Sequence, residues 1–289
     1  MNIKKSLILF ILLFLAFTKA IEANEVKLYQ MPGTQVIPIR DTQSDKQYEL
    51  YIKLPEEYSK DKDKKYPVIY FTDAVWHIEL LSAATAFIME EVILVGISWQ
   101  TNIEESVRQE YGPHFSRFGD YSFWEKPNPK HPKIKFGQAN KHLTFIRKDV
   151  IKYIENNYRT KLKSRSYFGY SAGGLFGAYT MLTQPDTFQN YMLGSPSVQW
   201  LTEGDTKIEF NNKKINANVF ITHGDKEKEL GAHIKAFLSF LDERGNENLF
   251  IKHLEIKGDH QTAFPMMGIR SVTWLSELNI DEPSNDQVN

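Results

Sequence analysis

The sequence predicts an α/β fold in which a mostly parallel central sheet carries helices on both faces. Three observations predict it. Short apolar runs of the kind that form buried strands alternate along the chain with segments of helical periodicity. No internal repeat interrupts this alternation. The length of 289 residues is enough for one large domain with a sizeable core.

The strands of the parallel part are predicted from continuous apolar runs. These runs cover residues 67–72, 92–97, 167–169, 191–194, 219–222 and 250–256. Two earlier stretches, 26–29 and 48–54, are predicted to form an antiparallel start to the sheet. In the second stretch every other residue is apolar, so that Tyr48, Leu50 and Ile52 share one face.

Helices are predicted between these strands. They cover residues 77–89, 143–158, 175–182, 232–241 and 265–278. Residues 100–137 break the alternation, because they are rich in aromatic residues and proline and are too long for an ordinary connection. Binding loops of α/β folds lie at such insertions. We therefore expect an aromatic cap over a pocket near the active site, with a well-packed surface loop as the alternative.

Composition excludes several classes of function. The formal net charge is -1 and basic residues are scattered, which gives no indication of nucleic acid as a partner. The chain contains no cysteine, so disulfides, thiolate metal sites, cysteine nucleophiles and a lipid anchor on cysteine are excluded. We expect neither a metal nor an organic cofactor.

The N-terminus has the order of a secretory signal peptide. A short basic segment, 1–5, precedes an apolar run over 6–17, and small residues follow. The run of about 12 residues is short of the roughly 20 that span a bilayer, which argues against a membrane anchor. We predict a signal peptide over 1–23, cleaved after Ala20 or Ala23, and a periplasmic or secreted protein. The catalytic domain is predicted over 24–280, followed by a flexible tail over 281–289.

The junction of the predicted strand at 167–169 and the next helix reads Gly-Tyr-Ser-Ala-Gly and matches G-x-S-x-G. In such a junction a sharp turn holds the serine in a strained conformation and projects its hydroxyl above the sheet. The following helix directs its free N–H groups at the site, so the Ala172 N–H is expected to face an oxyanion. The pattern predicts Ser171 as a nucleophile, the alternative being a tight turn with an incidental serine.

A nucleophilic serine needs a base, and in this arrangement the chain order is serine, acid, histidine. Of the eight histidines, only His260 follows both Ser171 and the last predicted strand in a loop. We predict His260 as the base. The loop after the strand at 219–222 offers three candidate acids that could fix the imidazole tautomer, and the residues alone do not choose among them. They are Asp225, Glu227 and Glu229.

The second oxyanion donor is expected from the loop after the strand at 67–72. A backbone N–H of Ala74 or Val75 would serve there. Aromatic residues beside these positions are predicted to bind the substrate. They are Tyr170 in the G-x-S-x-G turn, Trp76 in the oxyanion loop and Trp124 in the aromatic segment.

Several segments together resemble an esterase family of α/β-hydrolases that includes esterase D-like enzymes and the enterobactin and salmochelin esterases. Residues 66–73 read YPVIYFTD and resemble the family's YPVLYLLDG segment. Further matching segments follow in the family's order. They are 95–97 (VGI), 169–173 (GYSAG), 195–197 (SPS) with Trp200, and 258–260 (GDH). The resemblance covers roughly residues 35 to 278 and implies the α/β-hydrolase fold.

The resemblance implies Ser171 as nucleophile and His260 as general base. The family's acid tends to lie three residues after a loop glycine, which is Glu227 here, with Asp225 as the alternative. Some siderophore esterases of the family work with a Ser–His dyad. One departure is Ala74, where the family often has glycine.

The function predicted from these residues is a serine esterase that acts on a small-molecule carboxylic ester through an acyl-enzyme. A siderophore trilactone esterase is the alternative within the enzyme class. Cationic residues of the aromatic segment could then contact a charged aromatic ligand. They are Arg108, Arg117, Lys126 and Lys130. A catalytically inactive binding protein on a hydrolase fold is the alternative from another class.

Overall fold

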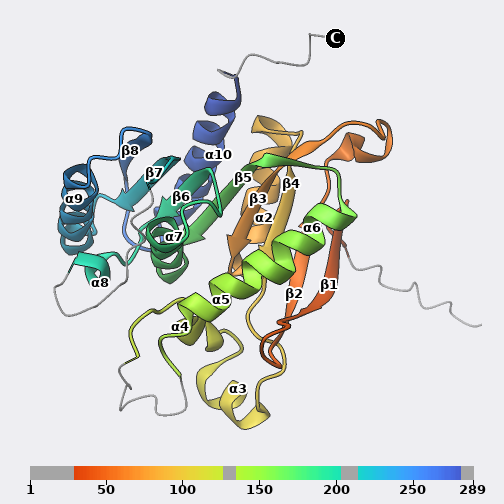
Figure 1. Ribbon diagram of the computed structural model, residues 1–289, viewed down its shortest axis with the longest axis horizontal. Helices are drawn as coiled ribbons and strands as arrows, with labels where there is room; N and C mark the ends of the chain where they lie inside the picture. The colour runs from red at the N-terminus through yellow and green to blue at the C-terminus, as the bar shows by residue number, and fades with distance from the viewer. Residues whose placement is uncertain (1–28, 126–134, 203–213, 281–289) are drawn as a thin grey trace, which may run out of the picture. The chain divides into compact units, whose positions relative to one another are not determined.

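The computed structural model describes residues 29–125, 135–202 and 214–280. From Gly33 onward the chain forms one unit built on an eight-stranded sheet (Figure 1). The strands are β1 (Thr34–Arg40), β2 (Gln47–Lys53), β3 (Tyr66–Thr72), β4 (Ile93–Ile97), β5 (Thr160–Tyr170), β6 (Asn190–Gly194), β7 (Ala217–Gly224) and β8 (Leu249–Ile256). The predicted signal peptide, the tail and residues 126–134 of the predicted cap lie outside the described residues.

The order of strands across the sheet is β1-β2-β4-β3-β5-β6-β7-β8. The pairs β1–β2 and β2–β4 are antiparallel, and every other pair is parallel. The prediction of a mostly parallel sheet with an antiparallel start is therefore confirmed. Because parallel strands run the same way, the loops after β3, β5, β7 and β8 emerge at one edge of the sheet, where open α/β sheets bind their ligands.

The first strand differs from the prediction. Residues 26–28 lie outside the described residues, Tyr29 has no regular structure, and β1 begins at Thr34. Among the described strands β1 pairs with β2 alone, and all of its residues are exposed or half-buried, so its short apolar stretch at 36–39, which includes a proline, does not have the pattern of a buried strand. Its Pro38 is tolerated because an edge strand leaves one side unpaired.

Helices cover both faces of the sheet. They are α2 (Ala74–Ile88), α3 (Glu105–Tyr111), α4 (Ser116–Asp120), α5 (Ala139–Phe145), α6 (Ile151–Asn157), α7 (Ala172–Thr183), α8 (Gln199–Thr202), α9 (Lys228–Glu243) and α10 (Phe264–Ile280). Figure 1 shows α6 and α7 in front of the sheet and α2 behind it, where α2 packs on α10. A π-helical turn, Ile146–Val150, joins α5 to α6, so the predicted helix at 143–158 begins earlier, at Ala139.

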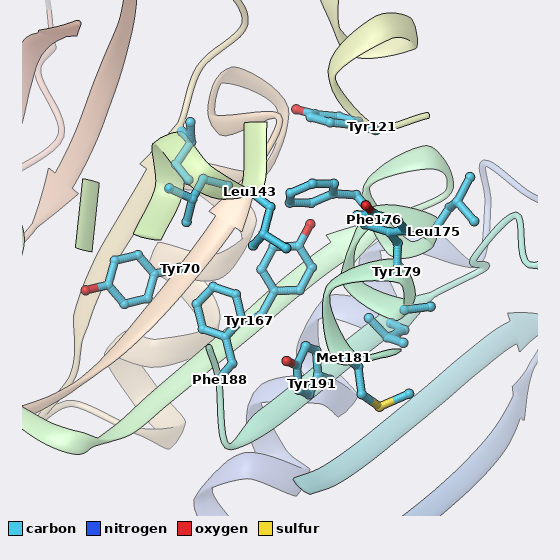
Figure 2. Packing of buried hydrophobic residues seen from close by; sticks show 14 of the residues in the cluster. Tyr70, Tyr121, Leu143, Tyr167, Leu175, Phe176, Tyr179, Met181, Phe188 and Tyr191 are labelled. Atoms are coloured by element: carbon cyan, nitrogen blue, oxygen red, sulfur yellow. The ribbon is translucent and has the colours of Figure 1, made fainter. Parts of the chain in front are cut away.

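The core between the sheet and the helices in front of it is rich in aromatic rings (Figure 2). Tyr167 of β5 packs on Phe176 of α7 with ring centroids 6.2 Å apart, and Phe176 packs on Tyr121 at 5.6 Å. The Tyr167 hydroxyl donates to the Gly173 carbonyl at 2.8 Å and lies 3.1 Å from the Thr72 hydroxyl. This buried tyrosine therefore ties the end of β3 to the start of α7.

His142 of α5 is a titratable group buried in this core. Four aromatic rings surround it, with centroids 5.3 to 5.7 Å away: Tyr48, Tyr121, Phe145 and Phe176. Among the described residues neither of its ring nitrogens has a hydrogen-bond partner. Burial disfavours the imidazolium and lowers the pKa of His142 to about 4.

His142 should make the protein less stable in acid. An unfolded histidine titrates near 6.5, so between pH 6.5 and 4 the unfolded state binds more protons than the folded state. The contribution is fully present above about pH 6.5 and falls by about 3 kcal/mol as the pH drops to 4. Urea unfolding at pH 7 and pH 4.5 should therefore show a smaller loss of stability in His142→Leu than in the wild type. Equal losses in the two proteins would contradict the prediction, and His233→Leu serves as the control.

Candidate active site

The candidate nucleophile lies at the sharp junction of β5 and α7. Ser171 has φ 55° and ψ −114°, a conformation that non-glycine residues rarely adopt. A Cβ on Gly169 would come within 2.3 Å of the Gly173 carbonyl oxygen, and a Cβ on Gly173 within 2.5 Å of the Thr72 hydroxyl oxygen. Both glycines of the motif are therefore required by crowding, and the turn packs directly against the end of β3.

His260 lies in the loop between β8 and α10, next to this turn. The Tyr170 hydroxyl donates to the His260 carbonyl oxygen, and the two rings pack with centroids 5.1 Å apart. Asp259 stabilises the loop by accepting from the backbone N–H groups of Gln261 and Thr262 and from the Thr262 hydroxyl. These hydrogen bonds from Thr262 and Gln261 lower the pKa of Asp259 to about 2. Since Tyr170 precedes Ser171, the histidine is held beside the serine turn.

A carboxylate holds the His260 ring from the loop after β7. Glu227 Oε1 lies 2.6 Å from His260 Nδ1. Its Oε2 accepts from the Ser195 hydroxyl and from the Gly224 N–H, each at 2.6 Å. Burial raises the pKa of Glu227, but the bonds from Ser195, Gly224 and His260 outweigh it and leave that pKa below its usual value. Glu227 is therefore ionised at neutral pH.

The other candidate acids lie differently. Asp225 Oδ1 accepts from the Gly258 N–H at 2.9 Å, and the Asp225 N–H donates to the Ile256 carbonyl at 2.7 Å. Asp225 thus joins the loop after β7 to the loop after β8. Glu229 lies in the first turn of α9 and is exposed. Of the three carboxylates, the structure brings Glu227 to His260.

Ser195, which the sequence offers only as part of the Ser-Pro-Ser segment of the resemblance, contacts the candidate acid Glu227. It follows β6, is fully buried and has a positive φ of 38°. Its N–H donates to the Thr222 carbonyl at 2.7 Å, which aims its hydroxyl at Glu227. The signal available in the sequence was a short Ser-Pro-Ser segment directly after a strand.

The loop after β3 contains the candidate oxyanion donors. Ala74 and Val75 are the first two residues of α2, as Ala172 is the first of α7, and N–H groups at such positions have no partner within the helix. Ala74 is fully buried, and a Cβ on Gly96 would come within 2.8 Å of the Ala74 methyl. The methyl at Ala74 therefore packs inward, into space left by Gly96.

Asp73 precedes these donors and was not predicted as a site residue. Its carboxylate is fully buried and pairs with Arg117, with Nε 2.8 Å from Oδ1 and Nη2 3.0 Å from Oδ2. The Trp99 indole N–H donates to Oδ1 at 2.6 Å. Burial raises the pKa of Asp73, but the Arg117 guanidinium outweighs it and holds that pKa below its usual value. Because this ion pair neutralises Arg117, the suggestion that Arg117 offers a free charge to a ligand is wrong.

The aromatic residues predicted to bind substrate fall in two clusters. Trp76 is 46% exposed and packs on Trp99, with ring centroids 4.7 Å apart. Trp124 is half-buried and packs on Trp200 at 5.0 Å. Tyr170, by contrast, lies in neither cluster, and its hydroxyl donates to the His260 carbonyl oxygen. Of these rings Trp124 comes from the described part of the insertion, and substrate contact stays a prediction for Trp76, Trp124 and Tyr170.

The described ranges, 29–125, 135–202 and 214–280, contain neither a metal cluster nor a membrane-spanning helix. No group of three or more His, Asp or Glu side chains there is arranged to hold a metal ion. No helix in those ranges combines the length and the apolar character needed to cross a bilayer.

A family model described as "Putative esterase" matches residues 42–276. The chain belongs to this esterase family. By sequence the esterase is similar to the ferri-bacillibactin esterase BesA of Bacillus subtilis, with 25% identity over 280 residues that cover 88% of this chain and 93% of BesA. The esterase is a carboxylic-ester hydrolase.

Solved structures similar to the esterase share its fold. The BES protein from Bacillus cereus matches with a TM-score of 0.71 and 24% identity, covering 87% of this chain and 97% of the other. The siderophore hydrolase EstB from Aspergillus nidulans matches with a TM-score of 0.67 and 18% identity, covering 89% and 99%. The α/β-hydrolase fold expected from the sequence is therefore confirmed.

Proposed function

We propose that the esterase works by covalent serine catalysis, with Ser171 as nucleophile, His260 as base and Glu227 as acid. The observation that carries the proposal is the 2.6 Å contact between Glu227 and His260 Nδ1, in a loop that Tyr170 ties to the strained turn at Ser171. Nucleophile, base and orienting carboxylate are the parts that such catalysis requires.

The proposed reaction has two halves. Ser171 Oγ attacks the ester carbonyl while His260 Nε2 accepts its proton, and Glu227 stabilises the imidazolium through Nδ1. The oxyanion lies between the Ala172 N–H and the N–H of Ala74 or Val75. His260 then protonates the leaving alkoxide, which departs as the alcohol. In the second half His260 activates a water that attacks the acyl-serine, and the carboxylic acid leaves.

We propose Glu227 as the acid in preference to Asp225 and to a Ser–His dyad. The Asp225 carboxylate has its own backbone partner at Gly258, whereas Glu227 is held by Ser195 and the Gly224 N–H and faces the imidazole. A carboxylate with two fixed donors on one oxygen offers the other oxygen in a fixed direction, which is what orienting an imidazole needs.

For the substrate we propose a siderophore with ester linkages. Two proteins similar to this chain support the proposal, because one is named a ferri-bacillibactin esterase and the other a siderophore hydrolase. Trp76 of the oxyanion loop, with the Trp99 and His114 rings packed against it, suits flat aromatic groups. We also propose export by a signal peptide over 1–23, which would bring the enzyme into contact with such ligands outside the cytoplasm.

The test combines two substrates and one label. The purified protein is assayed on p-nitrophenyl esters from acetate to long chains, and on a trilactone siderophore with and without iron. A dialkyl p-nitrophenyl phosphate is used to label the nucleophile, and the modified peptide is found by mass spectrometry. We expect hydrolysis of both substrate types and one label on Ser171. Hydrolysis of p-nitrophenyl esters alone would exclude the siderophore proposal but leave the serine esterase, and no hydrolysis with no label would favour a binding protein.

A further inference from the structure

The insertion between β4 and α5 contains Arg117, a buried cation that contacts the loop of candidate oxyanion donors. We infer that Arg117 is a positioning residue that acts through Asp73 to hold the oxyanion loop, residues 72–76, in its active conformation. The inference rests on the proposed serine mechanism and adds to it a role for the insertion, which would then form part of the catalytic apparatus.

The conformation of Asp73 requires support from its surroundings. Asp73 has φ 56° and ψ 46°, in the left-handed region, and it immediately precedes the two donor positions. Such a conformation costs free energy in a residue other than glycine and persists where the surroundings over-determine it. Here Arg117 holds both carboxylate oxygens and Trp99 holds one of them. The partners of the side chain thus determine the direction of the peptide groups that follow.

The other end of the loop is anchored to the fold. The Thr72 carbonyl oxygen lies 2.8 Å from His77 Nδ1 of α2, and the Thr72 hydroxyl lies 3.1 Å from the Tyr167 hydroxyl. Tyr167 in turn donates to Gly173, two residues after Ser171. Figure 2 shows Tyr167 among the other aromatic side chains of the core. With Thr72 held by the core, the Asp73 side chain is the point at which a charge of the insertion holds the loop.

Arg117 is itself held in place. Its guanidinium lies over the rings of Trp76 and Tyr121, 5.2 and 5.5 Å from their centroids. At the other end of α4, buried Asp120 accepts from Lys46 Nζ at 2.6 Å and from the Tyr48 hydroxyl at 3.0 Å. The short helix is therefore clamped to the sheet on one side and to the oxyanion loop on the other.

Burial makes this pair different from a surface ion pair. The side chains of Arg117 and Asp73 are 10% and 0% exposed. Removing one partner leaves an unpaired buried charge and destabilises the fold, whereas removing both relieves that cost. Loss of stability and loss of donor placement can therefore be separated by a double variant. Misplaced donors weaken binding of the transition state but not of the ground-state ester, so the effect should appear in kcat with KM unchanged.

The experiment measures kcat and KM for p-nitrophenyl acetate, together with Tm. The variants are Arg117→Met, Asp73→Asn, the double variant and Trp99→Phe. We expect each single charge variant to lose about a hundredfold in kcat, as for a lost oxyanion donor, with a lowered Tm. The double variant should recover Tm but not kcat. Trp99→Phe keeps both charges and should lose about tenfold in kcat, the effect of one charge-assisted hydrogen bond.

The matched control is Arg147→Met. Arg147 makes the same two-point contact with a carboxylate, Asp186, at 3.1 and 2.9 Å, but on a more exposed pair away from the loop. It should keep the wild-type kcat. Recovery of kcat together with Tm in the double variant, or a wild-type kcat in Trp99→Phe, would overturn the inference, even if the single charge variants fail to fold. If the wild type is inactive, or if the Ser171→Ala variant stays active, the serine mechanism itself is refuted. The inference about Arg117 then falls with it.

Discussion

Replacing Ser171 by alanine should lower kcat for ester hydrolysis at least about ten-thousandfold, because the acyl-enzyme route closes when its nucleophile is lost. Any residual rate would come from donors and binding groups that remain in place. Since Ser171 is held by backbone geometry and the hydroxyl is replaced by hydrogen, the variant should fold as the wild type does.

The measurement is kcat on p-nitrophenyl acetate with the circular dichroism spectrum and Tm as checks of folding. Ser276→Ala is a matched control, since Ser276 lies on α10 and its hydroxyl bonds the Thr273 carbonyl within that helix. A Ser171→Ala protein with more than about one per cent of the wild-type kcat would be incompatible with covalent catalysis at this residue.

Replacing Glu227 by glutamine should lower kcat about a thousandfold with little change in KM. The amide has nearly the same shape, but it cannot stabilise the imidazolium, and it can hold His260 in the wrong tautomer. It also changes the bonds at Oε2, where the Ser195 hydroxyl and the Gly224 N–H donate to the carboxylate. The effect should therefore combine lost charge with a displaced imidazole.

Asp225→Asn is the matched control for Glu227→Gln. It neutralises a carboxylate two positions away in the same loop, and the amide oxygen can still accept from the Gly258 N–H. We expect its kcat to stay within about threefold of the wild type, as for a change away from the reacting groups. If instead Asp225→Asn were the damaging change, the acid assignment would be reversed. If neither mattered, the enzyme would work as a Ser–His dyad.

Much of the fold could be predicted because its signals are local. Buried parallel strands are continuous apolar runs, and the predicted runs coincide with β3, β4, β6, β7 and β8 to within a few residues. β1 was missed because its apolar stretch at 36–39 is short, includes a proline and is not buried, and β5 was predicted too short because its first half is polar. A strand can be predicted from its sequence only where its position in the sheet buries its residues, because burial is what selects the apolar pattern.

The candidate nucleophile belongs to the same class of local signal. Because a Cβ on Gly169 would lie 2.3 Å from the Gly173 carbonyl oxygen, the turn needs glycines at fixed spacing, and five consecutive residues are enough to reveal this steric requirement. His260 was found by chain order, since a loop after the last strand emerges at the same edge of the sheet as the serine turn.

The sequence by itself determined the fold class, the family and the position of the serine turn, because each depends on residues close together in the chain. The resemblance favoured Glu227 as the acid and kept Asp225 open, and only the tertiary structure showed that Glu227 meets His260, 33 positions away, and that Arg117 meets Asp73 across 44 positions. The sequence does not distinguish a charged residue that is solvated from one that is buried in an ion pair. The partner of a charged residue depends on how loops far apart in the sequence pack together, and a local sequence pattern does not predict that packing.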